Sequence, residues 1–250
     1  MHFALISDIH SNAEALTAVL AEIDRRGVPR IFCLGDIVGY GPDPEFCVDR
    51  VPERCEWSLV GNHDKALFAN ADRFNPYARN AIEWTRDRLK PGFLRTKAQV
   101  ARWRYLEDLL LEKRIDDMYF VHGSPRDQIN EYIYREDVFF NDGKLREIFA
   151  TVQRVLFVGH THLPMIVNDQ LKGWLPAGTD PEFELEAGFK YIINVGSVGQ
   201  PRDRDPRACW VEVEENFGQW GICEITLEAT ACSASIPSLC IANQAAVRRA

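Results

Sequence analysis

Five short apolar segments, each followed within two residues by a residue able to bind a metal ion, constrain the fold of this chain most strongly. They are residues 3–6, 31–34, 57–60, 118–121 and 155–158. Their length and their aliphatic and aromatic composition are typical of buried β-strands, and longer helical patterns lie between them. This alternation predicts an α/β fold built from βαβ units, with a sheet covered by helices on both faces.

The helical patterns have recognisable ends. Ser11 and Glu14 have the spacing of a capping box, and Gly27 predicts the end of the helix that they begin. Asn75 and Pro76 predict the cap and first turn of a helix that runs to about residue 89. Further helices are expected over 98–111 and 144–150, strands over 191–195, 209–213 and 221–227, and a hairpin or loop over 172–190.

A single domain over residues 1–250 is the simplest organisation of the chain. No linker, internal repeat or low-complexity tract interrupts the pattern, and 250 residues suffice for a sizeable core. The segment from about residue 229 to residue 250 is weakly patterned, so we expect either an outer helix or a loose tail there.

Charge and hydropathy exclude some classes of partner. The formal net charge of −8 argues against bulk nucleic-acid binding and against anionic membrane surfaces as the main target. It leaves a phosphate substrate open, since bound metal ions would dominate the local field. We find no signal peptide and no apolar run long enough for a transmembrane helix, and therefore expect a cytoplasmic protein.

The seven cysteines do not suggest a zinc-finger or redox site. Their number is odd and no CxxC motif occurs. We expect most of them to be reduced and buried as small hydrophobic residues.

The residues that follow the five apolar segments form a coherent set of metal ligands. Ligand sites in α/β sheets lie beyond the carboxyl ends of the strands, so the five ends can converge on one site. Imidazole nitrogens with carboxylate or amide oxygens suit manganese, iron, zinc, cobalt or nickel. Seven candidates are too many for one ion and fit two ions that share one carboxylate. The candidates are Asp8, His10, Asp36, Asn62, His122, His160 and His162.

Short motifs contain these candidates together with one further histidine. The motifs are Asp8-x-His10, Gly35-Asp36, Gly61-Asn62-His63-Asp64, His122 and Gly159-His160-x-His162. In this order they resemble the full motif set of the calcineurin-like metallophosphoesterase superfamily. The strings GDIVGYGPDP, GNHD, HGSPRD, LFVGHTH and NVGSVGQPRD resemble a bacterial and archaeal branch of small stand-alone phosphoesterases, related to diadenosine tetraphosphatases and Ser/Thr phosphatases.

The resemblance implies a four-layer αββα sandwich with two central mixed β-sheets. It also implies two divalent transition-metal ions bridged by Asp36; manganese is the expected ion, with iron, zinc, nickel and cobalt as alternatives. His63 would contact the substrate phosphate as general acid or charge stabiliser, and Asp64 would orient His63. The implied ligands are Asp8, His10, Asp36 and His162 for the first ion, and Asp36, Asn62, His122 and His160 for the second.

Such a site predicts a phosphoesterase that hydrolyses a phosphodiester or a small phosphomonoester. Two metal ions about 3.5–4 Å apart can lower the pKa of a bridging water toward about 7, and the resulting hydroxide attacks phosphorus. A protein Ser/Thr phosphatase and a dinucleoside polyphosphate hydrolase are alternatives. A non-catalytic scaffold of the same fold is a third, but such scaffolds lose ligand or catalytic histidines, whereas here every ligand position and His63 are present.

Three further residues have two possible roles each. Arg126 and Arg202 follow strand-end turns and could grip phosphate, although surface salt bridges are the plainer interpretation. Tyr40 could line the same pocket. Asp64 could also cap a helix. The expected partner is a phosphate ester, with nucleotide-like esters among the candidates. Apolar residues near Trp174, Trp210 and Trp220 would suit either a homodimer surface or buried packing.

Overall fold

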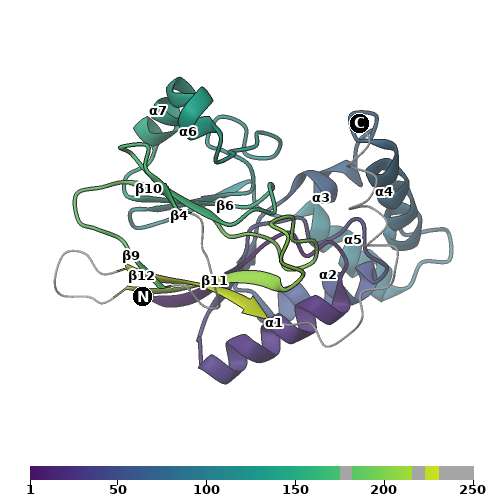
Figure 1. Ribbon diagram of the computed structural model, residues 1–250. Coiled ribbons are helices and arrows are strands. Elements are labelled where there is room, and N and C mark those ends of the chain that lie inside the picture. The colour runs from purple at the N-terminus through teal and green to yellow at the C-terminus, as the bar shows by residue number, and fades with distance from the viewer. Residues whose placement is uncertain (175–181, 216–222, 231–250) are drawn as a thin grey trace.

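The computed structural model describes residues 1–174, 182–215 and 223–230, and two mixed β-sheets form the centre of this described part (Figure 1). In the first sheet three parallel strands continue into an antiparallel extension. Its strand order is β3 (Trp57–Ser58), β2 (Ile31–Cys33), β1 (His2–Ile6), β11 (Ala208–Glu215), β12 (Cys223–Thr230) and β9 (Glu182–Glu184).

The second sheet has a parallel centre with antiparallel strands on both sides. Its strand order is β4 (Glu112–Ile115), β5 (Met118–Val121), β6 (Val155–Val158), β10 (Tyr191–Asn194), β7 (Met165–Asn168) and β8 (Gly173–Trp174).

Helices lie on the outer face of each sheet, and the two sheets face one another between them (Figure 1). The helices on the side of the first sheet are α1 (Ala13–Arg26), α2 (Pro44–Arg54), α3 (Asn62–Ala66), α4 (Pro76–Leu89) and α5 (Lys97–Glu107). Those on the side of the second sheet are α6 (Asp137–Phe140) and α7 (Asp142–Thr151).

The alternation of side chains along each strand produces three separate cores. Phe3 and Leu5 of β1 point into the core between the sheets, where Phe120 and Phe157 of the second sheet meet them. Ala4 and Ile6 of the same strand point the other way, toward the helices of the first sheet. A third core lies between α7 and the outer face of the second sheet. Three cores separate four layers, which confirms the αββα sandwich.

One detail of the strand-based prediction is wrong. A single sheet with helices on both faces does not occur; each sheet has helices on one face and the other sheet on its second face. The sequence could not distinguish these cases, because a strand buried on both faces is apolar throughout whether a helix or a sheet covers it. In β5 and β6 every residue is buried.

Most predicted helices are confirmed, with shifted ends. The first begins after Asn12, whose side chain accepts a hydrogen bond from the backbone of Ala15, so Ser11 is not the cap. It ends at Gly27, which has φ +71°, as predicted. The helix predicted over 98–111 ends at Glu107 because Leu110 leaves it and forms a bridge with Leu59.

The hairpin or loop expected over 172–190 contains strands of both sheets. β8 pairs with β7 in the second sheet and β9 pairs with β12 in the first, so the two do not form a hairpin with each other. The strand pair predicted near 209–213 and 221–227 is confirmed as β11 and β12. The weakly patterned segment expected from residue 229 lies, apart from the end of β12, outside the described residues.

Two expectations about apolar residues are resolved by burial. Trp210 is fully buried and Trp174 packs against the core between the sheets, so packing accounts for both, whereas Trp220 lies outside the described residues. Cys33, Cys47, Cys55 and Cys209 are buried, as expected. Among the helices of the described residues, none has the length and apolar character that a membrane span requires.

Candidate metal centre

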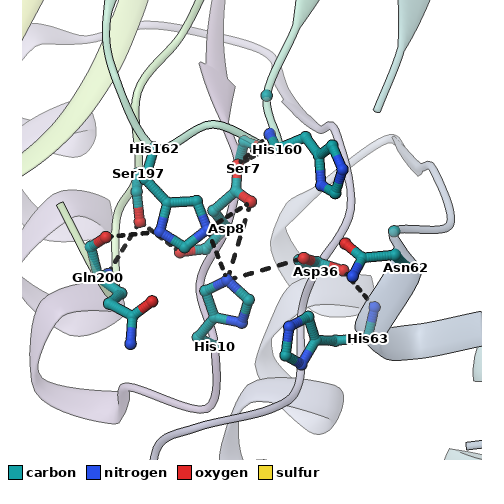
Figure 2. Close-up of polar contacts among 12 residues, drawn as sticks. Ser7, Asp8, His10, Asp36, Asn62, His63, His160, His162, Ser197 and Gln200 are labelled. Atoms are coloured by element: carbon teal, nitrogen blue, oxygen red, sulfur yellow. Dashed lines mark hydrogen bonds and ion pairs between the residues drawn. The ribbon is translucent and has the colours of Figure 1, made fainter. Parts of the chain in front are cut away.

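The carboxyl ends of β1, β2, β5 and β6 meet beside the start of α3 and bring the seven predicted ligands into one buried cluster (Figure 2). Three groups of side chains each have their ligand atoms within 4.8 Å of one another. The groups are Asp8 with His10 and His162, His10 with Asp36 and His63, and Asp36 with His122 and His160. The predicted convergence of strand ends therefore occurs.

The first half of the cluster contains Asp8, His10 and His162. The Nε2 atoms of His10 and His162 are 3.0 Å apart, and Asp8 Oδ1 lies 3.2 Å from His162 Nε2 and 3.8 Å from His10 Nε2. These three side chains face a common point from the loops after β1 and β6 (Figure 2).

The second half contains Asn62, His122 and His160. His122 Nε2 lies 3.2 Å from His160 Nδ1 and 3.4 Å from Asn62 Oδ1. Asp36 joins the two halves, because its Oδ2 atom is 3.5 Å from His122 Nε2 and 3.7 Å from His10 Nε2. A single carboxylate oxygen thus stands between the two groups, where the bridging role was predicted.

The ring nitrogens that point away from the cluster determine the tautomers of its four histidines. Each faces a backbone carbonyl oxygen, which can only accept a hydrogen bond, so the outer nitrogen carries the proton. The contacts are His10 Nδ1 with Val38 O at 3.2 Å, His122 Nδ1 with Leu34 O at 2.9 Å, His162 Nδ1 with Gln200 O at 2.6 Å and His160 Nε2 with Asn130 O at 3.2 Å.

In neutral rings of this tautomer, the inner nitrogens direct lone pairs at one another. His10 with His162 and His122 with His160 then form two pairs of acceptors at 3.0 and 3.2 Å. Asp8 Oδ1 is buried beside the first pair without a hydrogen-bond partner among the described residues. A cation between the acceptors removes this repulsion, and metal-ligating histidines hold a carbonyl with their outer nitrogen in the same way. The donor set therefore fits divalent metal ions.

The pKa shifts agree with this donor set at most positions. Burial lowers the pKa of His10 well below its usual range and that of His160 to about 4, so both rings are neutral. Burial raises the pKa of Asp36, but the neighbouring His122 and His63 outweigh it and keep this carboxylate ionised. His122 is the exception: burial lowers its pKa, yet the charges of Asp36 and Asp8 raise it to about 9, so an incoming ion would displace its proton.

The backbone at the cluster is strained. Five of the seven predicted ligands have a positive φ, a region that L-residues other than glycine visit rarely and at a cost of about 1–3 kcal/mol. They are Asp8 at 53°, His10 at 50°, Asp36 at 52°, His160 at 68° and His162 at 61°. Strain concentrated on these residues indicates that the loops are shaped for the site and not for stability.

A model of the calcineurin-like phosphoesterase superfamily domain matches residues 1–216. The chain belongs to the calcineurin-like phosphoesterase superfamily. All seven predicted ligands lie within the matched residues, and membership implies divalent metal ions at such a cluster.

Two relatives agree with this membership. Uncharacterized protein MJ0912 of Methanocaldococcus jannaschii is 38% identical over 221 residues, which is 85% of this chain and 82% of that protein. The crystal structure of a metallophosphoesterase from Sphaerobacter thermophilus is 36% identical, with a TM-score of 0.75 over 99% of this chain and 93% of that one. The superfamily fold and the described sandwich therefore coincide over nearly the whole chain.

His63 lies at the edge of the metal cluster of this superfamily member. Its backbone N–H donates to Asp36 Oδ1 at 2.8 Å. The centroid of its ring lies 4.8 Å from that of His10 and 4.6 Å from that of Tyr40. The ring Nδ1 is buried without a hydrogen-bond partner among the described residues. His63 is thus held at the cluster by its backbone and by ring packing.

Among the described residues, no hydrogen bond joins the Asp64 carboxylate to the ring of His63, which the resemblance implies that Asp64 orients. The two carboxylate oxygens of Asp64 accept hydrogen bonds from the backbone N–H groups of Val38 at 3.1 Å and Gly61 at 3.0 Å. Because Asp64 is the third residue of α3, its side chain folds back onto the helix start and accepts the N–H of the N-cap residue Gly61, which has no side chain to return a bond. Asp64 therefore positions His63 only through the start of α3, and the capping interpretation is the one that the hydrogen bonds support.

The two predicted arginines have different surroundings. Arg126 forms ion pairs with Glu131 at 2.9 Å and Glu147 at 2.5 Å, the plainer of its two predicted roles. Arg202 forms no ion pair with a carboxylate of the described residues, and its backbone N–H donates to the carbonyl of His162. Burial raises the pKa of Tyr40, whereas the nearby Arg202 charge opposes the rise, so these two side chains adjoin each other at the site.

Several residues that support the cluster were not predicted. Asn194 is fully buried, and its Nδ2 donates to the Gly159 carbonyl at 2.6 Å and to Thr161 Oγ1 at 2.9 Å, which holds the loop that carries His160 and His162. It follows the apolar residues of β10, so the strand-end pattern itself was the available signal. Gly39 has φ +107°, and a Cβ there would lie 2.5 Å from His63 Nδ1, so only glycine fits under the ring.

Proposed function

We propose that this chain is a dinuclear metal-dependent phosphoesterase that hydrolyses a phosphodiester or a small phosphomonoester. The observation that carries the proposal is the position of Asp36 Oδ2 between two nitrogen-rich groups, 3.7 Å from His10 Nε2 and 3.5 Å from His122 Nε2. A carboxylate oxygen so placed would be shared by two ions, and two adjacent ions suit the in-line displacement at phosphorus.

Each half of the cluster would hold one ion. Asp8, His10, Asp36 and His162 would hold the first, and Asp36, Asn62, His122 and His160 the second. When bound, two such ions supply positive charge for the phosphate oxygens and lower the pKa of water. The set of imidazole, carboxylate and amide donors without a thiolate supports manganese as the proposed ion.

His63 would assist the departure of the leaving group. Burial lowers the pKa of His63 to about 4, so the free ring is neutral near pH 7. A phosphate beside the ring would favour the protonated form, because a negative charge within a few ångströms raises the pKa of an imidazole. The proton would then be available to the leaving oxygen. Arg202 and Tyr40, which adjoin this edge of the site, would contact the phosphate oxygens.

The assembled position of His63 favours an enzyme over a scaffold. His63 and all seven candidate ligands are buried in one cluster, and five of the ligands are held in a strained backbone conformation. Strain of this kind is retained where it contributes to function. A cytoplasmic location and a homodimer are further parts of the proposal; the free, buried thiols of Cys33, Cys47 and Cys55 support the former.

Hydrolysis of two generic esters tests the proposal. Protein stripped with a chelator and reloaded with Mn, Ni, Co, Zn or Mg would be assayed with bis(p-nitrophenyl) phosphate and p-nitrophenyl phosphate. We expect metal-dependent hydrolysis of at least one ester, and elemental analysis should give close to two ions per chain. A folded protein that binds one ion or none, or that hydrolyses neither ester with any metal, would refute the proposal.

A further inference from the structure

A ladder of aromatic rings leads outward from the candidate metal centre. The Tyr132 ring stacks on the ring of His160, with centroids 3.8 Å apart and planes 12° from parallel. The Tyr134 ring stacks in turn on Tyr132, with centroids 5.2 Å apart and the same 12° angle. Both tyrosines are more than a third exposed, at 36% and 40%, although the histidine beneath them is buried. Flat aromatic surface is thus presented to solvent two ring steps from a predicted metal ligand.

A cavity of about 470 Å³ adjoins this ladder. Tyr134, Ile133, Leu163, Pro164 and Met165 give it apolar walls, and Thr161, which lies between His160 and His162, connects it to the metal centre. Small-molecule sites have volumes of about 300–1,000 Å³ and largely apolar walls with a few polar groups. The cavity is therefore large enough for a substituent as bulky as a nucleoside.

Positive charge that no carboxylate of the described residues pairs also lines this cavity. Arg202 and Arg204 line it, and within the described part of the chain neither forms an ion pair with a carboxylate. Arg126 and Arg207, in contrast, each bind a neighbouring acid. The two acids that line the cavity are outnumbered by its three arginines, and one of these acids, Glu136, is paired with Arg135 at 3.7 Å. The lining of the cavity therefore carries a net positive charge, which favours an anion.

We propose that this cavity is a subsite for the nucleoside part of the substrate, an inference that rests on the proposed phosphoesterase function. The base would stack on Tyr134, the sugar would span the ring step to Tyr132, and Arg202 and Arg204 would contact phosphate. Base–aromatic stacking accepts any base, so the subsite selects nucleotides as a class. An aryl phosphate, whose ring is bonded directly to the phosphate oxygen, would reach only Tyr132.

Calorimetry with matched ligands tests the subsite. AMP, ribose 5-phosphate and phenyl phosphate would be titrated into manganese-loaded wild-type protein and into Tyr134→Leu, Tyr134→Phe and Tyr77→Leu. We expect AMP to bind at least about tenfold more tightly than ribose 5-phosphate, because stacking of one base contributes about that factor or more. Tyr134→Leu should abolish the difference and Tyr134→Phe should retain it. Tyr77→Leu, at an exposed tyrosine of α4, is the matched control and should retain it.

The outcomes separate this inference from the proposed function. Equal affinities of AMP and ribose 5-phosphate, or a difference that survives Tyr134→Leu, would overturn the subsite even if the generic esters are hydrolysed. An advantage of phenyl phosphate as large as that of AMP would overturn its assignment to a nucleoside. A preference for AMP without hydrolysis of any ester would support the subsite and refute the proposed function. Melting temperature and metal content of each variant identify any that fold incorrectly.

Discussion

The two sheets contribute different chemistry to the same site. The loops after the strands of the first sheet carry the acidic and amide ligands, Asp8, Asp36 and Asn62, whereas those of the second sheet carry three imidazoles, His122, His160 and His162. His10 is the exception, since it follows β1. With Asp36 shared, each half of the cluster therefore combines a carboxylate from the first sheet with at least one imidazole from the second. Neither sheet alone offers a complete set of ligands, so the candidate site is formed jointly by loops of both sheets.

The largest effect is expected for Asp36→Asn, which removes the shared carboxylate. Asn has the same shape but no charge, so both ions should bind weakly and metal-dependent hydrolysis should disappear. Elemental analysis after gel filtration measures the ions that remain. Asn62→Ala is the matched variant, because Asn62 contacts only the second half, and it should release only one ion. Full retention of one ion by Asp36→Asn would contradict the sharing of the Asp36 carboxylate by the two ions.

A smaller but still large effect is expected for His63→Ala. His63 lies in α3, which follows a strand of the first sheet, and it is not a predicted ligand. The variant should therefore keep both ions. Loss of a general acid typically lowers the rate about 10²- to 10⁴-fold. The turnover number with bis(p-nitrophenyl) phosphate measures it. His2→Ala is the control, since His2 pairs with Glu212 at 2.7 Å and should leave the rate unchanged. A rate loss accompanied by loss of metal would show that His63 acts as a ligand.

Removal of the metal ions should lower the stability of the folded protein, because the ligands come from both sheets. A ligand at a hundredfold excess over its dissociation constant stabilises the folded state by about 2.7 kcal/mol. For a chain of this size that corresponds to about 5–10 °C in melting temperature. The melting temperature of chelator-treated protein with and without added manganese measures the difference. If the two melting temperatures coincide, the ions do not stabilise the contact between the two sheets.

The smallest effect is expected for a pair of arginines that both follow strands of the second sheet. Arg202→Ala should raise KM about tenfold, because a hydrogen bond to a charged group contributes about 1.5–3 kcal/mol. Arg126→Ala should change KM less than about twofold, since Arg126 is already paired with Glu131 and Glu147 at the surface. Steady-state kinetics of both variants measure the contrast. Equal changes would show that the second sheet contributes no arginine of its own to substrate binding.

Much of the fold and the site was predictable because both depend on local patterns. Apolar runs of strand length predicted β1, β2, β5, β6 and β10, and the residues after them predicted the seven ligands. Other elements had no clear local signal. The helix α2 has the same cap and first-turn proline pattern, Asp43-Pro44, as the predicted helix at Asn75-Pro76, but Pro52 inside it argues against a helix. Tyr132 and Tyr134 lie in an irregular segment whose course depends on long-range packing.

The amino-acid sequence by itself determined which residues are candidate metal ligands, since ligand type and the position after a strand are local properties. Only the tertiary structure decided how these residues are distributed between the two sheets and which of them face one another. It separated the strands into two sheets, turned the carboxylates of one toward the imidazoles of the other, and aimed the Asp64 carboxylate at two backbone N–H groups. The physical reason is that a buried strand has an apolar sequence whether a helix or a second sheet covers it. Contacts between distant loops, in contrast, exist only after the layers pack.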